Sequence, residues 1–288
     1  MKMRLVLPLL VLMLIVKPGY AAQSTITESE GYACQGEDKS RKQTEQAALV
    51  DARKKATEFV ASHIKSETRL NNNELEKDIV EAYANAEVKV VKELEKAWYK
   101  DPSLGDCYKV KITAEVIPDP KPMAIVAADT QASDSPQAPL KVKTWTDKAE
   151  YKTGEKIKIY LKGNKPFFAR VIYKDVNGEI IQILPNPYRT ENAFNGGVTY
   201  VIPEGNDQFD MEVSPPFGEE NVIVYASTAP LGEIGVKTRG GVYQIKTAKK
   251  DIAIKSRSLK MSSKNESKGD GAATSEFFED KVVLKTKK

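Results

Sequence analysis

The second half of the chain is divided by turn signals at short, regular intervals, and this spacing restricts the folds that it can adopt. Glycine, asparagine and proline separate the apolar runs, and the pair Asn177-Gly178 is typical of a two-residue hairpin. Short strands at this spacing predict a β-sandwich or barrel. The runs, all rich in Val, Ile, Tyr and Phe, are Lys156–Leu161, Phe168–Tyr173, Glu179–Leu184, Val198–Ile202, Phe209–Val213 and Val222–Ala226.

Further strands are expected toward the end of this half. Residues 241–245 and 251–255 are strand-like, and Lys281–Thr286 is a last such run. A polar stretch with two glycines predicts a surface loop at 262–275. We therefore expect residues 144–288 to form an all-β, sandwich-like domain that contains this loop.

The first half has a different pattern, because a long helical repeat stands between strand-like segments. Ala48, Ala52 and Ala56 recur every four residues, with larger apolar residues beside them, so one helix face can approach a sheet closely. Strand-like segments lie at Gly31–Gly36 and Tyr108–Val116, while the segment 86–99 is compatible with helix or strand, and we favour a strand at Val88 and Val90. We expect residues 23–117 to form an α+β domain of a strand, a long helix and antiparallel strands.

Between the two halves lies a segment rich in Pro, Ala, Ser and Asp. Residues 117–140 contain five prolines and few large apolar side chains, a composition that cannot sustain a core. The prediction is an extended linker over residues 118–143.

The N-terminal segment has the layout of a secretory signal peptide. Lys2 and Arg4 precede an unbroken apolar run over residues 5–16, which covers about 18 Å as a helix and is too short for a hydrocarbon core of about 30 Å. The small residues at 19–22 allow cleavage after Ala21 or after Ala22, so we assign residues 1–22 to the signal. We expect a periplasmic or secreted protein with no membrane span after cleavage.

Charge argues against a nucleic-acid partner. The formal net charge of +4 includes Lys2, Arg4 and Lys17, and removing these three positive charges leaves +1. Lys and Glu alternate along the remaining chain, a pattern typical of a solvated surface rather than of a basic stripe.

The only two cysteines are Cys34 and Cys107, near the first and last strands predicted for the α+β half. In an oxidising compartment such a pair most simply forms a disulfide, and terminal strands of a small unit are often neighbours. A redox-active or metal-binding pair would need closely spaced cysteines or added histidine ligands.

Catalytic and metal-site signals are missing from the sequence. His63 is the single histidine and falls on the apolar face of the long helix, where a packing role is favoured over a catalytic base. The chain contains no Gly-x-Ser-x-Gly turn, and its carboxylates mostly lie beside lysines. We expect no enzyme activity, no cofactor and no metal site.

Aromatic residues are concentrated in the second half, and most of them are expected in its core. Tyr188 and Phe194 follow Leu184 in a segment rich in Pro and Asn, where packing demands less of a side chain. These two residues are the candidates for ligand binding.

The segment from about Trp145 to Leu231 resembles a bacterial domain of unknown function, number 4384, which occurs on exported or envelope-associated proteins. The matching pieces, in order, are Tyr151-Lys-Thr-Gly154-Glu, Phe168-Ala-Arg-Val-Ile-Tyr173, Asn177-Gly178, Ile183-Leu-Pro-Asn186, Asn195-Gly-Gly197, Val201-Ile-Pro203 and Phe217-Gly-Glu219-Glu.

The first half resembles the strand-helix-strand modules of flagellar T-ring assembly proteins and of the lipoprotein-20 family. The resemblance is carried by Gly31–Gly36, the alanine-spaced helix and the closing strand Tyr108–Val116. It implies an envelope scaffold that docks on other proteins. Lipid-bearing members have a cysteine at the cleavage site, and none is present here, which argues for a free periplasmic form.

These features lead to two functional hypotheses. The first is an exported accessory or scaffold protein that binds partner proteins in a cell-envelope assembly, flagellar or secretory. The alternative is a module in which the β-rich half binds cell-wall glycan or peptide near Tyr188 and Phe194.

Overall fold

The computed structural model describes residues 22–37, 39–239, 241–257 and 274–288. The predicted signal peptide lies outside these ranges except for Ala22, and so does most of the predicted polar loop. The last two residues assigned to that loop, Thr274 and Ser275, begin a strand instead. Among the described helices, none combines the length and the apolar character needed to span a bilayer.

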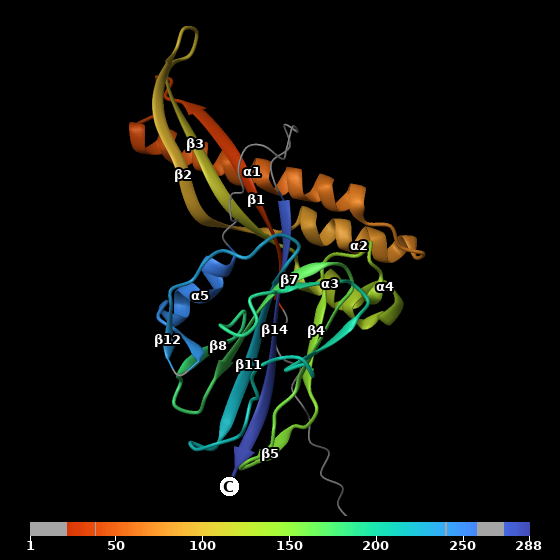
Figure 1. Cartoon of the computed structure of the whole chain (residues 1–288). Coiled ribbons are helices and arrows are strands. Elements are labelled where there is room, and N and C mark those ends of the chain that lie inside the picture. Colours follow the sequence, from red (N-terminus) through yellow and green to blue (C-terminus); the bar gives the residue numbers. More distant parts are fainter. Residues whose placement is uncertain (1–21, 38, 240, 258–273) are drawn as a thin grey trace, which may run out of the picture.

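The fold is mixed α+β and is organised by one large, curled, mostly antiparallel sheet that has the form of a half-barrel (Figure 1). Two short strands attach beside its main path. β5 (Glu150–Lys152) pairs in parallel with β14 (Thr274–Lys287), and β9 (Ala193–Phe194) pairs with β7 (Phe167–Lys174). The main strands, in their order across the sheet, are β12 (Val236–Arg239), β13 (Val242–Ile245), β8 (Ile180–Leu184), β7 (Phe167–Lys174), β11 (Glu219–Ser227), β14 (Thr274–Lys287), β1 (Ala22–Cys34), β3 (Gly105–Ile117) and β2 (Glu87–Asp101).

The strand β14 joins the two halves of the chain. One edge of β14 pairs with β1, with Ala22 opposite Glu279, and the other edge pairs with β11, with Tyr225 opposite the same glutamate. The structure therefore does not show a clearly separate all-β domain after the α+β part, because backbone hydrogen bonds run without interruption from one half to the other. Sequence patterns describe the faces of a strand and carry no information about its distant neighbours.

The N-terminal strands are covered by the long helix α1 (Arg41–Glu67), which lies across β1 and β3 (Figure 1). Ser40 caps α1: its Oγ accepts a hydrogen bond from Gln43 N, and its own N–H donates to Gln43 Oε1. The alanine face is buried as expected, and Gly31 allows the close approach, since a Cβ there would lie 2.0 Å from Ala48 O. The buried residues of α1 are Thr44, Ala48, Ala52, Ala56, Val60 and Ile64.

Next in the chain, α2 (Asn73–Ala84) begins with Asn72 as its N-cap and packs on α1. The hairpin β2–β3 then follows, so the ambiguous segment around Val88 and Val90 is a strand.

The segment 118–143 is not an extended linker. Helices α3 (Pro120–Ala128) and α4 (Thr130–Asp134) form there, and Asp119 Oδ1 caps α3 by accepting from Lys121 N at 2.9 Å. Proline is compatible with the first turn of a helix, where its missing N–H would have no partner, so these prolines start a helix. Val126 packs in the N-terminal core and Leu140 in the C-terminal core, and the segment contributes to both.

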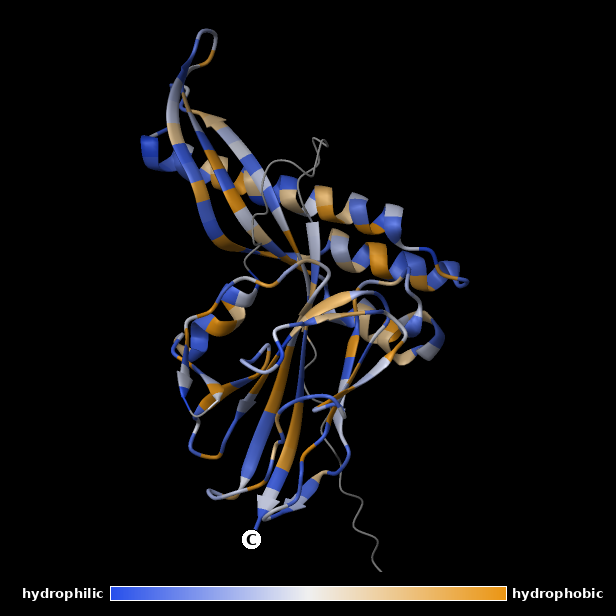
Figure 2. Ribbon diagram, in the orientation of Figure 1, coloured by the Kyte–Doolittle hydropathy of each residue, from blue (hydrophilic) through white to orange (hydrophobic). Residues whose placement is uncertain are grey.

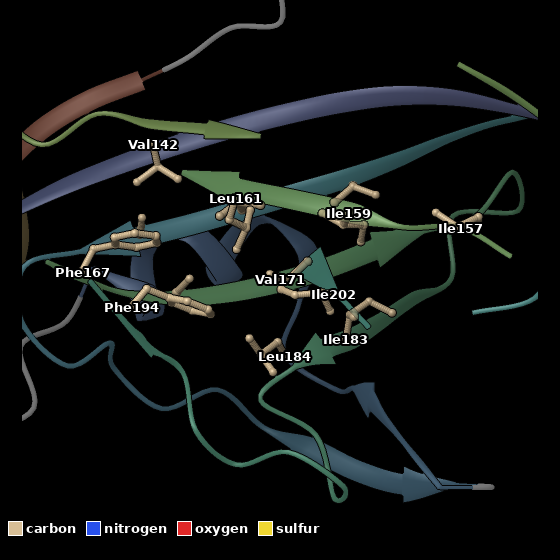
Figure 3. Close-up of a cluster of buried hydrophobic side chains, with 14 of the residues drawn as sticks. Val142, Ile157, Ile159, Leu161, Phe167, Val171, Ile183, Leu184, Phe194 and Ile202 are labelled. Carbon is tan, nitrogen blue, oxygen red and sulfur yellow. The ribbon is translucent and has the colours of Figure 1, made fainter. Parts of the chain in front are cut away.

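A small second sheet is made of β10 (Thr199–Ile202), β6 (Ile159–Gly163) and β4 (Val142–Thr146). Figure 3 shows Leu161 and Ile159 from this sheet facing Val171 and Leu184 from the large sheet. The apolar side chains of the two sheets form the C-terminal core, and the alternation of hydropathy along the strands is visible in Figure 2.

Three local expectations differ from the structure. Residues 251–255 lie in helix α5 (Lys249–Ser256), where Ile252 is buried and Ile254 is exposed. Residues 209–213 form only one isolated bridge, between Lys156 and Glu212. The hairpin at Asn177-Gly178 exists, but Asp175 N bonds Glu179 O around a three-residue loop, with Gly178 at positive φ.

Candidate functional site

A pocket of about 330 Å³ opens in the C-terminal half, against the part of the large sheet formed by β7 and β8. The lining also includes the segment 209–216 and two exposed residues, Tyr188 and Val242, which we call the rim. The lining residues are Ile157, Tyr173, Asp175, Glu179, Ile181, Gln182, Ile183, Asn186, Tyr188, Phe209, Asp210, Met211, Glu212, Val213, Ser214, Pro215, Pro216, Glu220, Gly241 and Val242.

The wall that carries Tyr188 is held by a side chain of the preceding loop. Asn186 is buried, and its Oδ1 accepts hydrogen bonds at 2.8 Å from the backbone N–H groups of Tyr188 and Arg189. Its Nδ2 donates to Ile183 O at 2.7 Å, which ties the turn back to β8. This Asx-type turn fixes the direction in which Tyr188 leaves the sheet.

The segment 209–213 of the lining is held in place by backbone hydrogen bonds. Ile157 N donates to Met211 O at 2.8 Å, and Val213 N donates to Glu155 O at 2.9 Å. These bonds hold the segment 209–213 beside residues 155–157 although neither segment forms a regular strand there.

Two aromatic rings of the lining, those of Tyr188 and Phe209, lie near each other. The rings of Tyr188 and Phe209 have centroids 6.5 Å apart with planes inclined by 24°. Tyr188 is 52% exposed, so its ring is available to a bound group.

Among the described residues, the lining carries acidic side chains and no basic ones. It includes Asp175, Glu179, Asp210, Glu212 and Glu220, and no described lysine, arginine or histidine. Just outside it, Lys156 Nζ lies 2.7 Å from Asp210 Oδ2 on the exposed surface. The described lining therefore has a negative potential.

Glu220 is the buried member of this acidic set. It is 2% exposed and accepts hydrogen bonds from the Tyr173 hydroxyl and, at 3.2 Å, from Thr286 Oγ1. No ion pair within the described residues involves it. Burial, and next the hydrogen bond to Glu220, raise the pKa of Tyr173 far above its usual value, so this hydroxyl stays protonated and donates a hydrogen bond to Glu220.

Of the two residues suggested by the sequence for ligand binding, the structure brings only Tyr188 to the pocket. Phe194 is 4% exposed and lies outside the lining. Its ring packs against Phe167, with centroids 5.2 Å apart, and against Tyr200, with centroids 4.9 Å apart. The short pairing of β9 with β7 places Phe194 in the core, which loop composition does not reveal.

The acidic lining was missed because carboxylates were interpreted as surface residues. A signal for Glu220 does exist in the sequence: Glu220, Val222, Val224 and Ala226 alternate along β11, and the last three are buried in the C-terminal core. A carboxylate in register with buried apolar residues is expected to point to the same side of the sheet.

Cys34 and Cys107 are disulfide-bonded, as expected from the sequence. They lie directly opposite each other on the neighbouring strands β1 and β3, and the bond links these two strands. Neither cysteine belongs to the pocket lining.

His63 is half-buried on α1, with its Nε2 3.3 Å from Thr274 Oγ1 at the start of β14. Within the described ranges, no group of three or more His, Cys, Asp or Glu side chains is arranged to hold a metal ion.

Comparison with known proteins finds a family match for the region that contains most of the pocket lining. No curated protein matches the chain, and no solved structure matches it. Residues 150–230 match the family model described as a domain of unknown function, DUF4384, and most of the pocket lining lies in this region.

Proposed function

We propose that this protein is an exported, non-catalytic accessory protein that binds a partner protein in a cell-envelope assembly, flagellar or secretory, through the pocket of its DUF4384 region. The observation that carries the proposal is the pocket itself, with the exposed ring of Tyr188 at its rim and the buried Glu220 in its lining. The signal-like start of the sequence and the Cys34–Cys107 bond favour an oxidising compartment.

A binding role is favoured over catalysis by the chemistry of the lining. Among the described lining residues there is no histidine, lysine or cysteine, three residue types that often supply bases and nucleophiles near neutral pH. The two tyrosines carry aromatic surface, and the hydroxyl of Tyr173 is already committed to Glu220.

Site-specific photo-cross-linking in intact cells tests this proposal. A benzophenone amino acid replaces Val242, a 39% exposed residue of the rim, and in a matched control it replaces Val50, which is 62% exposed on α1. We expect the Val242 position to give a discrete adduct with one envelope protein that Val50 does not give, and Tyr188→Ala to reduce it. Equal adducts from both positions, or none, would count against a role for the pocket.

The alternative function is binding of cell-wall glycan or peptide by the same half of the chain. It is favoured by the exposed ring of Tyr188, because sugar rings stack on exposed aromatic faces. Co-sedimentation with insoluble cell wall separates the two functions: retention that is lost in Tyr188→Ala but kept in Tyr99→Ala supports wall binding. Tyr99 is a suitable control because it is 41% exposed and lies on β2.

A further inference from the structure

We infer that the pocket binds an arginine side chain presented by the partner polypeptide. This inference rests on the proposed function and names the chemistry that the pocket recognises.

The first argument is charge complementarity. Five acidic residues and no basic one belong to the part of the lining that the structure describes, so an anionic or neutral group gains little there, whereas a cation reduces the repulsion among the carboxylates.

The second argument is the state of a buried acidic group of the lining. Glu220 is 2% exposed, and its partners in the described structure are the hydroxyls of Tyr173 and Thr286, which carry no charge. A buried carboxylate whose donors are all neutral favours a cationic ligand rich in N–H groups.

The third argument is shape. Tyr188 and Phe209 contribute aromatic rings to the lining, and a planar guanidinium stacks on ring faces while its N–H groups bond carboxylates in a fork. A volume of about 330 Å³ is at the small end of ligand pockets and suits one long side chain. Pro215, Pro216 and Val242 are exposed beside the opening and provide apolar surface for the flanking backbone.

The test is an NMR titration of the full chain with three capped tripeptides, acetyl-Gly-X-Gly-amide, in which X is arginine, lysine or citrulline. Citrulline keeps the planar shape and length of arginine and removes its charge. We expect the arginine peptide to shift the resonances of lining residues and to bind at least tenfold more tightly than the citrulline peptide, with the lysine peptide between them. Equal binding of arginine and citrulline peptides, binding in which lysine exceeds arginine, or no shift of any lining resonance would overturn the inference.

Two variants tie the binding to the site. Glu220→Gln removes the buried charge and Tyr188→Ala removes the exposed ring, and each is expected to weaken binding of the arginine peptide at least fivefold. Glu219→Gln is the matched control, because Glu219 is the exposed neighbour on the same strand and lies outside the lining. Since Tyr188 is half exposed, its variant keeps the test valid if Glu220→Gln fails to fold.

The outcome separates this inference from the proposed function. A specific adduct at Val242 without preference for the arginine peptide would leave the pocket as a binding site and remove arginine as its occupant. Preference for the arginine peptide without any cellular adduct would keep arginine as a ligand of the pocket and count against the proposed binding of an envelope protein.

Discussion

Nε of Arg257 lies 2.6 Å from Oε1 of Glu115, and this ion pair connects the end of α5 to β3 in the other half of the chain. Both side chains are nearly buried, at 12% and 10% exposure. Arg257 also lies 3.2 Å from Glu279 Oε2 on β14 and stacks over Phe277. Charges thus reinforce the junction that the backbone of β14 creates.

Removal of Arg257 is expected to weaken this junction strongly. Arg257→Met leaves Glu115 and Glu279 without a counter-charge, and the unfolding free energy should fall by about 3–5 kcal/mol, as for other broken buried pairs. Adding Glu115→Gln should recover part of the loss, because it removes one unpaired charge. Urea unfolding of the two variants measures both effects, with the exposed Arg239→Met as control; a loss no larger than that of the control would contradict the prediction.

The ionisation of Glu279 should appear in the pH dependence of stability. Burial raises the pKa of Glu279, and Arg257 offsets only part of this effect. The ionised form is therefore disfavoured in the folded state, so Glu279→Gln should stabilise the protein above the raised pKa of the folded state. The advantage should shrink as pH falls through that pKa and vanish below the unfolded value of about 4.3. Unfolding curves from pH 4 to pH 8 test this, and an advantage that grows toward low pH would show that the sign is wrong.

Gly31→Ala should separate α1 from the sheet. The added Cβ would lie 2.0 Å from Ala48 O and 2.4 Å from Ala52 N, both backbone atoms, so the helix must shift. We expect a loss of about 1–3 kcal/mol by overpacking. Gly205→Ala is the control, since nothing lies within 4 Å of its added Cβ, and it should change stability by less than about 0.5 kcal/mol. Thermal unfolding compares the two; equal melting temperatures would refute the close contact.

Phe194 and Tyr188 should respond differently to alanine. Phe194→Ala leaves a hole beside Phe167 and Tyr200 and should destabilise the protein by about 3–5 kcal/mol. Tyr188→Ala should cost far less, because about half of this side chain is already in water, and its effect should be on binding. Denaturant unfolding of both variants decides the matter, and similar losses would mean that Tyr188 also has a core role.

Local patterns predicted those elements whose cause is local. The four-residue spacing of Ala48, Ala52 and Ala56 predicted the buried face of α1, and strand-like segments predicted β3, β7 and β11. The strand expected at 251–255 was misplaced, because Ile252 and Ile254 fit one buried and one exposed position of the short helix α5.

The remaining features depend on contacts between distant residues. The pairing of β14 with β1 and β11 has no local signature, and it decides whether the chain forms two units or one sheet. The pocket also gathers residues from separate segments, so only Tyr188 was found in advance. Pro120 and Pro122 were interpreted as signs of extended chain because a proline alone does not distinguish a linker from a helix start.

The position of β14 also determines when the sheet can close. A ribosome delivers β1 before all the other described strands, yet the register pairs Ala22 with Glu279. At about 5–20 residues per second, β1 waits roughly 10–50 s for its partner to be synthesised. Through that interval β1 keeps an open edge, β11 adds a second one once it is synthesised, and the growing chain remains a substrate for chaperones that hold unfinished polypeptides.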